Sequence, residues 1–183
     1  MKRSLFVAAL MGMALVSLPF AARAQVSTVA KAVEFGVAAG AALPMSDLST
    51  FYQTGFNGTV TVGFHPQMIP LGIRVDGAYN QFSAKSGTLG GNVHFTSVTG
   101  NLVYSIPSET VAPYLIGGAG VYNAAINIPG FGSGSSNKFG WNLGGGIKMP
   151  LSGFDTFLEA RYNQVQGNGG SLKFIPITFG VMF

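Results

Sequence analysis

Large apolar residues alternate with small or polar ones along the final stretch of the chain, residues 171–183. One side of this stretch carries Ile175, Ile177, Phe179, Val181 and Phe183. The other side carries Pro176, Thr178, Gly180 and Met182. Successive side chains of a β-strand point to opposite faces, so a period of two is a strand signal. The pattern predicts a strand with one continuous apolar face.

The same alternation recurs seven more times, which gives eight predicted strands. They cover residues 33–43, 55–64, 71–82, 92–104, 111–123, 139–149, 157–163 and 171–183. Short links that contain proline alternate with longer ones such as 44–54, 83–91 and 124–137. An even number of strands joined in this way is typical of a membrane barrel, which turns its apolar face to lipid. The predicted fold is all-β: an eight-stranded antiparallel up-and-down transmembrane β-barrel.

The lengths of the apolar segments favour strands over helices. Outside the first 24 residues, the longest stretch without charged or strongly polar side chains is 111–122, which is twelve residues. A spanning helix needs about 20 apolar residues, whereas a tilted spanning strand needs about 9 to 11. Aromatic residues near the strand ends are expected to form one girdle at each membrane interface. The two sets are Phe64, Tyr104 and Phe183 at one rim, and Tyr79, Trp141 and Tyr162 at the other.

A soluble, calycin-like barrel of eight strands is the alternative fold. It would place the large apolar face inside and leave the charged face to solvent. Phe, Trp, Leu and Ile from every strand would then have to share an interior that is only wide enough for ordinary side chains. The size of the apolar face therefore favours the membrane barrel.

The first residues have the organisation of a secretory signal peptide. Residues 1–3 are Met-Lys-Arg, an apolar run follows at 5–18, and 22–24 form an Ala-Arg-Ala cleavage site. The sequence predicts a signal peptide at 1–24 and an outer-membrane barrel domain at 25–183. An uncleaved membrane anchor is the alternative, but a proline and the cleavage site stand where a spanning helix would continue.

Composition narrows the possible functions further. The chain contains 10 Lys and Arg and 6 Asp and Glu, with a formal net charge of +4. Lys2, Arg3 and Arg23 belong to the predicted leader, so the mature chain keeps seven basic residues against six acidic ones. Nucleic-acid binding is therefore not expected. The absence of cysteine excludes disulfides and thiolate metal sites.

Six charged residues fall on the predicted inner face and balance to zero: Glu34, Arg74, Asp76, Lys148, Glu159 and Arg161. An unpaired charge in a narrow lumen is costly, so the pairs Arg74/Asp76 and Glu159/Arg161, each two residues apart on one face, are expected to meet across strands in a network that closes the lumen. The alternative is a small water or ion channel, because small inward residues could leave a hydrated path. Those residues are Gly36, Ala38, Gly40, Gly63, Gly72, Gly140, Gly144, Gly146 and Gly180.

Two segments are weakly patterned. Residues 111–123 contain so many glycines that the two faces differ little, and we favour Tyr114, Ile116 and Tyr122 pointing outward. The link 124–137 ends in a Gly/Ser tail and is expected to be a mobile loop that could contact host or phage surfaces.

Four segments carry a family resemblance: PYLIGGAGVY, KFGWNLGGGIKMP, FLEARYNQV and IPITFGVMF. They are similar to strands of the small OmpA/OmpX-like and opacity-type outer-membrane barrel proteins. A last strand that ends on an aromatic residue also resembles the signal read by the barrel assembly machinery, and Phe179, Val181 and Phe183 would carry it.

The resemblance implies a location in the bacterial cell outer membrane and a structural or surface-interaction role. The implied partners are outer-membrane lipid and lipopolysaccharide, the barrel assembly machinery and periplasmic chaperones. No second domain follows the barrel, so the peptidoglycan binding of full-length OmpA proteins is not implied. Nothing in the sequence indicates an oligomeric state.

A catalytic role is not expected. Some small outer-membrane barrels that resemble this chain act on lipid A with Ser and His, and His94 and Ser97 are the only nearby pair. A spacing of three places them on opposite faces of a strand that has no Asp or Glu to orient the imidazole. His65 lies in a proline-bearing turn and is expected to be solvated. With two distant histidines, neither a metal site nor a cofactor is predicted.

Overall fold

The structure, a computed structural model, describes residues 33–66, 69–86, 91–108, 110–128, 132–167 and 170–183. The predicted signal peptide at 1–24 lies outside the described residues. The elements in chain order are β1 (Val33–Met45), α2 (Asp47–Phe51), β2 (Gly55–Phe64), β3 (Leu71–Ser83), β4 (Asn92–Ser105), β5 (Ala112–Ile128), β6 (Gly132–Leu151), β7 (Phe154–Gln166) and β8 (Ser171–Met182). Among these, no helix is long and apolar enough to cross a membrane.

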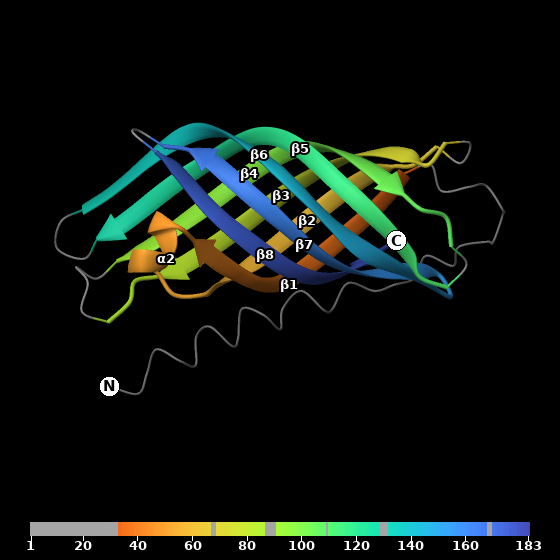
Figure 1. The fold of residues 1–183 in the computed structure, drawn as a ribbon, viewed down its shortest axis with the longest axis horizontal. Coiled ribbons are helices and arrows are strands. Elements are labelled where there is room, and N and C mark those ends of the chain that lie inside the picture. Colours follow the sequence, from red (N-terminus) through yellow and green to blue (C-terminus); the bar gives the residue numbers. More distant parts are fainter. Residues whose placement is uncertain (1–32, 67–68, 87–90, 109, 129–131, 168–169) are drawn as a thin grey trace, which may run out of the picture. The chain divides into compact units, whose positions relative to one another are not determined.

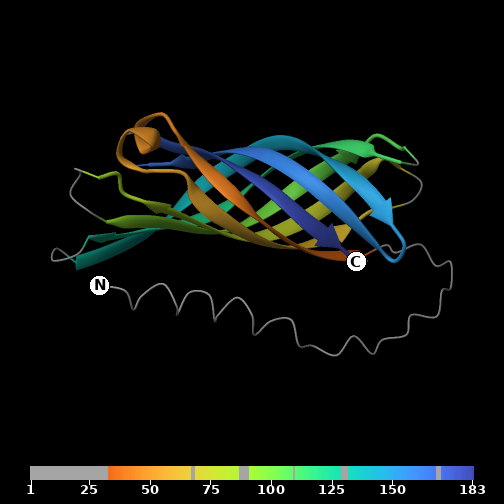
Figure 2. The same cartoon turned by 90° about the horizontal axis from the view of Figure 1, so that it is seen from below.

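The eight strands form one closed barrel in sequence order. Each strand pairs antiparallel with the next, and β8 pairs with β1, so that Val37 lies opposite Val181 at the closure. Figures 1 and 2 show the strands strongly tilted to the long axis of the barrel. The predicted fold class, an eight-stranded antiparallel up-and-down barrel, is confirmed.

The two faces of the wall differ as the alternation predicts. Large apolar side chains more than half exposed cover the outside, for example Val60, Val98, Leu115, Leu143 and Phe179. Buried polar side chains face the lumen, for example Asn57, Thr61, Asn80, Thr99, Asn142 and Thr178. This is the reverse of a soluble barrel and suits a lipid environment. The soluble alternative is therefore wrong.

We call the end where β1 begins and β8 ends the terminal end, and the opposite end the distal end. At the terminal end, the Phe183 N–H donates to the Phe35 carbonyl oxygen at 2.7 Å. Tyr104 pairs with Leu71 at the same end. Toward the distal end, the rings of Trp141 and Tyr162 lie 5.5 Å apart on the outer face. The aromatic residues thus gather at two levels.

The predicted facing of β5 is wrong. Tyr114, Ile116 and Tyr122 are 6%, 1% and 1% exposed, so they point into the lumen. The neighbouring strand makes room for them, because a Cβ added at Gly146 or Gly140 would lie 2.6 Å from the ring of Tyr114 or Tyr122, respectively. Glycine in β6 therefore supplies the volume that the tyrosines of β5 fill.

Two predicted loops contain regular structure. The link 44–54 includes the short helix α2, whose Leu48 is buried. Most of the link 124–137 is strand, since pairing of β5 with β6 continues to Ile128 opposite Gly132. Gly and Ser can prolong a strand because the ladder is built from backbone groups. The prediction of a loop here is wrong for the described part of that segment.

Candidate functional site: the barrel lumen

Four of the predicted inner charges meet in the middle of the lumen. Arg74 and Asp76 lie on β3, and Glu159 and Arg161 lie on β7. Arg74 Nη2 lies 2.7 Å from Glu159 Oε2, and Arg161 Nη1 lies 2.7 Å from Asp76 Oδ2. These two strands are four positions apart in the ring, on opposite walls. The lumen charge cluster, as we name these four residues, therefore spans the barrel.

Contacts along each wall complete the cluster. Arg161 also pairs with Glu159 on β7. Arg74 Nε lies 3.0 Å from Asp76 Oδ1 and donates a hydrogen bond to Oδ2 at 3.3 Å. Each guanidinium therefore touches both carboxylates. Buried charges persist only where they are paired and hydrogen-bonded in this way.

Neutral side chains add further hydrogen bonds to both carboxylates, while Asp76 Oδ1 accepts no hydrogen bond among the described residues. Tyr114 Oη donates to Glu159 Oε2 at 2.8 Å, and Asn101 Nδ2 donates to Asp76 Oδ2 at 2.9 Å. Asn142 Nδ2 donates in turn to Asn101 Oδ1 at 2.9 Å. The tyrosine that β5 turns inward is thus a hydrogen-bond donor to the cluster.

The pairing of β7 with β8 is interrupted beside the lumen charge cluster. Pairing of β7 with β8 is continuous as far as Ala160 opposite Ile177 and resumes at Asn163. The gap falls opposite Pro176, which has no backbone N–H to donate. Asn163 Nδ2 donates to the Arg161 carbonyl oxygen at 3.0 Å instead. The side-chain amide thereby replaces the missing backbone donor next to Arg161.

The other two predicted charges form a second group nearer the terminal end. Lys148 Nζ lies 3.1 Å from Glu34 Oε1 and 3.2 Å from Asp155 Oδ2. These side chains keep 15% to 28% of their surface exposed. Sequence reasoning missed Asp155 because it lies between the predicted strands 139–149 and 157–163. The alternation could have found it, because Asp155 stands two residues before Phe157 on the inner face.

An aromatic cluster fills the distal part of the lumen. Phe95 and Phe174 stack with ring centroids 5.2 Å apart, and Phe82 lies edge-on at 5.6 Å from Phe174. Phe95 and Phe174 come from β4 and β8, which are opposite walls. Leu48 of α2 belongs to the same buried group. We call Phe82, Phe95 and Phe174 the distal aromatic cluster, and sequence reasoning did not identify it.

The inner glycines do not leave an open path. A Cβ added at Gly36, Gly40, Gly72, Gly140, Gly144, Gly146 or Gly180 would come within 3 Å of another heavy atom. At Gly180, for example, the neighbour is the Phe157 ring at 2.5 Å. Gly63 has more room, with its nearest neighbour at 3.8 Å. The expectation that small residues leave free volume is wrong for these seven positions, because bulky side chains and backbone occupy it.

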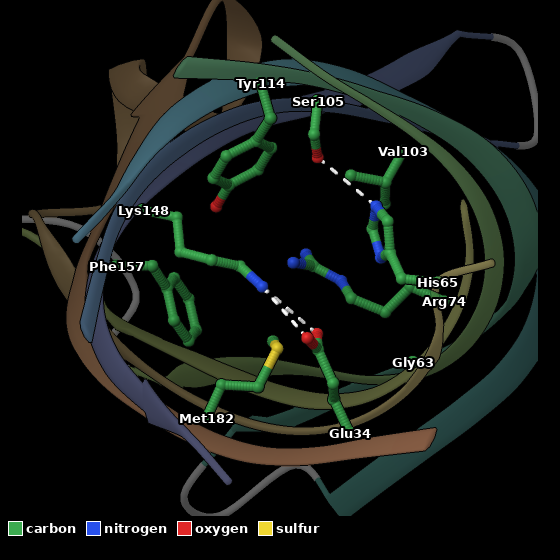
Figure 3. A pocket seen from close by; sticks show the side chains of 10 residues that line it. All are labelled: Glu34, Gly63, His65, Arg74, Val103, Ser105, Tyr114, Lys148, Phe157 and Met182. Atoms are coloured by element: carbon green, nitrogen blue, oxygen red, sulfur yellow. Dashed lines mark hydrogen bonds and ion pairs between the residues drawn. The ribbon is translucent and has the colours of Figure 1, made fainter. Parts of the chain in front are cut away.

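Two cavities lie within the described part of the lumen, one on each side of the lumen charge cluster, and a further one opens at the terminal rim beside Glu34, Phe154 and Asp155. Of the two beside the cluster, the one toward the terminal end is lined by Arg74, Tyr114, Lys148 and Phe157 among others and is drawn in Figure 3. The other is lined mainly by Asn, Thr and Ser side chains together with Glu159. Each of the two cavities beside the cluster has a volume of about 20 Å³. That volume admits about one water.

His65 is not the solvated residue that the sequence predicts. Its ring lies over Gly72, where an added Cβ would come 2.5 Å from it, and its Nε2 lies 3.2 Å from Ser105 Oγ. Figure 3 shows the ring beside Arg74 at the cavity wall. Burial lowers the pKa of His65, Lys148 and Arg74 lower it further, and Glu34 partly opposes them. A neutral imidazole is therefore favoured at this end of the barrel.

The residues considered for catalysis and for metal binding are not brought together. His94 lies on the outer face with its ring 5.8 Å from that of Tyr79, whereas Ser97 is buried on the inner face. No group of three or more His, Cys, Asp and Glu residues that could hold a metal ion occurs among the described residues. Phe179 and Phe183 of the predicted assembly signal are exposed on the outer side, and Val181 is partly buried.

A closed antiparallel barrel with an apolar outer face and a charged, hydrogen-bonded interior defines a transmembrane β-barrel. The chain matches the family model described as outer membrane protein beta-barrel domain over residues 6–183. It belongs to this family, and its location is the bacterial outer membrane.

Solved structures share the fold at low sequence identity. Neisserial surface protein A is 18% identical, with a TM-score of 0.66, and the match covers 82% of this chain and 96% of that one. The attachment invasion locus protein Ail of Yersinia pestis is 19% identical, with a TM-score of 0.51 and coverages of 82% and 97%. The N-terminal barrel domain of Pseudomonas aeruginosa OprF is 14% identical, with a TM-score of 0.50 and the same coverages. Comparison with curated protein sequences finds no match.

Proposed function

We propose that this outer-membrane protein is a closed barrel that does not conduct ions and that serves as a membrane-anchored scaffold for an external surface. The observation that carries the proposal is contact between opposite walls at two levels. Arg74 meets Glu159 across the middle of the lumen, and Phe95 meets Phe174 across its distal part. An ion would have to displace a paired charge cluster and then a set of packed rings.

The distal end supplies the proposed external surface. Outer-membrane barrels place short turns in the periplasm and longer connections outside, which assigns the terminal end to the periplasm. Helix α2 and the prolonged β5–β6 hairpin then project outward. Outer-membrane lipid would cover the apolar wall, and lipopolysaccharide would surround the distal rim. This arrangement agrees with a structural or surface-interaction role.

Conductance of the refolded chain 25–183 in a planar bilayer tests the proposal. A heat-shift gel first confirms that the barrel is folded. We expect a silent bilayer. Discrete and reproducible openings would contradict the closed scaffold.

The second candidate function is a small water or ion channel, favoured by the two water-sized cavities that flank the lumen charge cluster. In that case the cluster would control the connection between them. Arg161→Ala would then change the conductance of an open barrel. An unchanged trace in this variant would count against the cluster as a control element.

Barrel assembly machinery and periplasmic chaperones are the partners we propose during biogenesis. Phe179, Val181 and Phe183 would form the assembly signal, since they continue the apolar outer face along β8 and one residue beyond it. Phe183→Ala is expected to refold in detergent like the wild type but to reach the outer membrane in smaller amounts. Equal amounts in fractionated membranes would remove Phe183 from the proposed signal.

A further inference from the structure

The β5–β6 hairpin extends beyond the closed part of the barrel. Pairing of β6 with β5 runs to Gly132, but pairing of β6 with β7 starts only at Gly140 opposite Val165. Figures 1 and 2 both show β6 reaching past β7 and β8 at the distal end. We call residues 132–137 the β6 edge. Among the described residues, it has a neighbouring strand on one side only.

The surroundings of the β6 glycines show to which neighbouring strand each residue of β6 directs its N–H and C=O groups. A Cβ added at Gly144 would lie 2.3 Å from the carbonyl oxygen of Ala160, the residue before its partner Arg161. A carbonyl oxygen in that position points toward β6 and accepts a hydrogen bond from the N–H of the residue after Gly144. Gly144 and Arg161 are therefore opposite each other without a hydrogen bond between their own backbone groups. Even-numbered residues of β6 therefore direct their N–H and C=O groups to β5, and odd-numbered ones direct them away.

This alternation continues into the β6 edge because its register with β5 has no bulge. Ser133, Ser135 and Asn137 consequently point their N–H and C=O groups away from β5. Each of these residues presents one donor and one acceptor toward the side that β7 does not reach. The result is a row of alternating donors and acceptors at the spacing of a strand.

The β6 edge lacks the usual protection of an exposed strand. Its sequence is Gly-Ser-Gly-Ser-Ser-Asn, and all six residues are exposed. Natural edges are blocked by charged side chains, proline or bulges, none of which occurs within residues 132–137. Small uncharged side chains let another backbone approach closely. This edge is open to strand pairing.

We propose that the β6 edge binds an extended segment of an external polypeptide, which adds to the sheet as one more strand. Six residues span about 20 Å, so the bound segment would have about six residues. Gly and Ser form no side-chain pockets, and recognition would rest on backbone bonds and tolerate many sequences. This proposal depends on the proposed function in one respect: the β6 edge is taken to be part of the external surface, and the bound segment is the partner of that surface.

A second copy of the chain fits this edge less well than an incoming peptide. Strands of a barrel tilt by about 35–45° from the barrel axis. Two copies side by side in one membrane tilt in the same sense, so a rotation about the membrane normal would make their β6 edges cross rather than align. A peptide arriving from solution can adopt the direction of the edge.

Amide hydrogen exchange of refolded 25–183 in lipid nanodiscs tests the geometry. In the free protein, the amides of Ser133, Ser135 and Asn137 should exchange fast, while those of Gly134 and Ser136 should be slower. Equal rates for the two sets would overturn the assigned edge.

Binding is tested with a fluorescent eight-residue peptide of alternating Thr and Val and with its N-methylated form, which lacks alternate donors. The wild type and Ser135→Ala should bind the unmethylated peptide and protect the three edge amides. Ser135→Pro removes one edge donor without touching the bonds to β5, and it should weaken binding at least tenfold. No binding to the wild type, equal binding by both Ser135 variants, or equal binding of both peptides would overturn the proposal. A silent bilayer with no peptide binding would refute this inference and leave the closed scaffold standing.

Discussion

Replacement of Glu159 by glutamine removes one charge from the lumen charge cluster and keeps its shape. Glu159 is 4% exposed and accepts hydrogen bonds from Arg74, Arg161 and Tyr114. In Glu159→Gln, two buried guanidiniums share the single carboxylate of Asp76. Removal of one partner from a buried ion pair costs roughly 3–5 kcal/mol. At about 1.4 kcal/mol per tenfold, the unfolding equilibrium should shift by roughly two to three and a half powers of ten.

The assay is urea unfolding of the refolded barrel in phospholipid vesicles. Trp141 is the one tryptophan of the chain, so its fluorescence reports on the outer wall without added labels. Glu34→Gln is the matched control, because Glu34 pairs with Lys148 at a partly exposed site and Lys148 keeps Asp155. That control should lose less than about 1 kcal/mol. A loss from Glu159→Gln no larger than from the control would refute the cross-lumen pairing.

Three further perturbations probe the rest of the lumen. Phe174→Ala should cost about 3–5 kcal/mol in the same urea assay, since it removes the ring at the centre of the distal aromatic cluster. Gly146→Ala should destabilise the barrel because its Cβ would lie 2.6 Å from the Tyr114 hydroxyl oxygen, whereas Gly58→Ala, with nothing within 4 Å, should be neutral. His65 has a lowered pKa in the folded barrel, so the unfolded chain binds the proton more readily. Stability should therefore fall as the pH drops below 6.5, the ordinary value of the imidazole. His65→Gln should show a smaller loss of the urea midpoint between about pH 8 and about pH 5, and an unchanged pH dependence would contradict the lowered pKa.

The alternation of side-chain size was sufficient to predict the strands and the facing of most of them. In β6, for example, Phe139 and Trp141 stand against Gly140 and Asn142, so the outer face is evident. In β5, both faces mix glycine with larger residues. The information that turns Tyr114 inward lies in Gly146 of the next strand, and the two become neighbours only once the register is known.

The charged residues that line the lumen could be predicted from the sequence, because every second residue of each strand points to the inner face. The pairs Arg74/Asp76 and Glu159/Arg161 also form, each within one strand. The pairing across the lumen could not be predicted, since the contact of Arg74 with Glu159 depends on the closure that brings β3 opposite β7. The distal aromatic cluster was missed for a different reason. The alternation along their strands places Phe95 and Phe174 on the inner face, but a membrane barrel is expected to turn its large residues to lipid.

The central claim is that side chains from opposite walls meet inside the barrel and close it. Nuclear Overhauser contacts between the rings of Phe95 and Phe174, measured for refolded 25–183 in lipid nanodiscs, test this most directly. The rings are 5.2 Å apart between centroids, so cross-peaks between their protons are expected. Cross-peaks from both rings to water, with none between the rings, would show an open lumen and contradict the account.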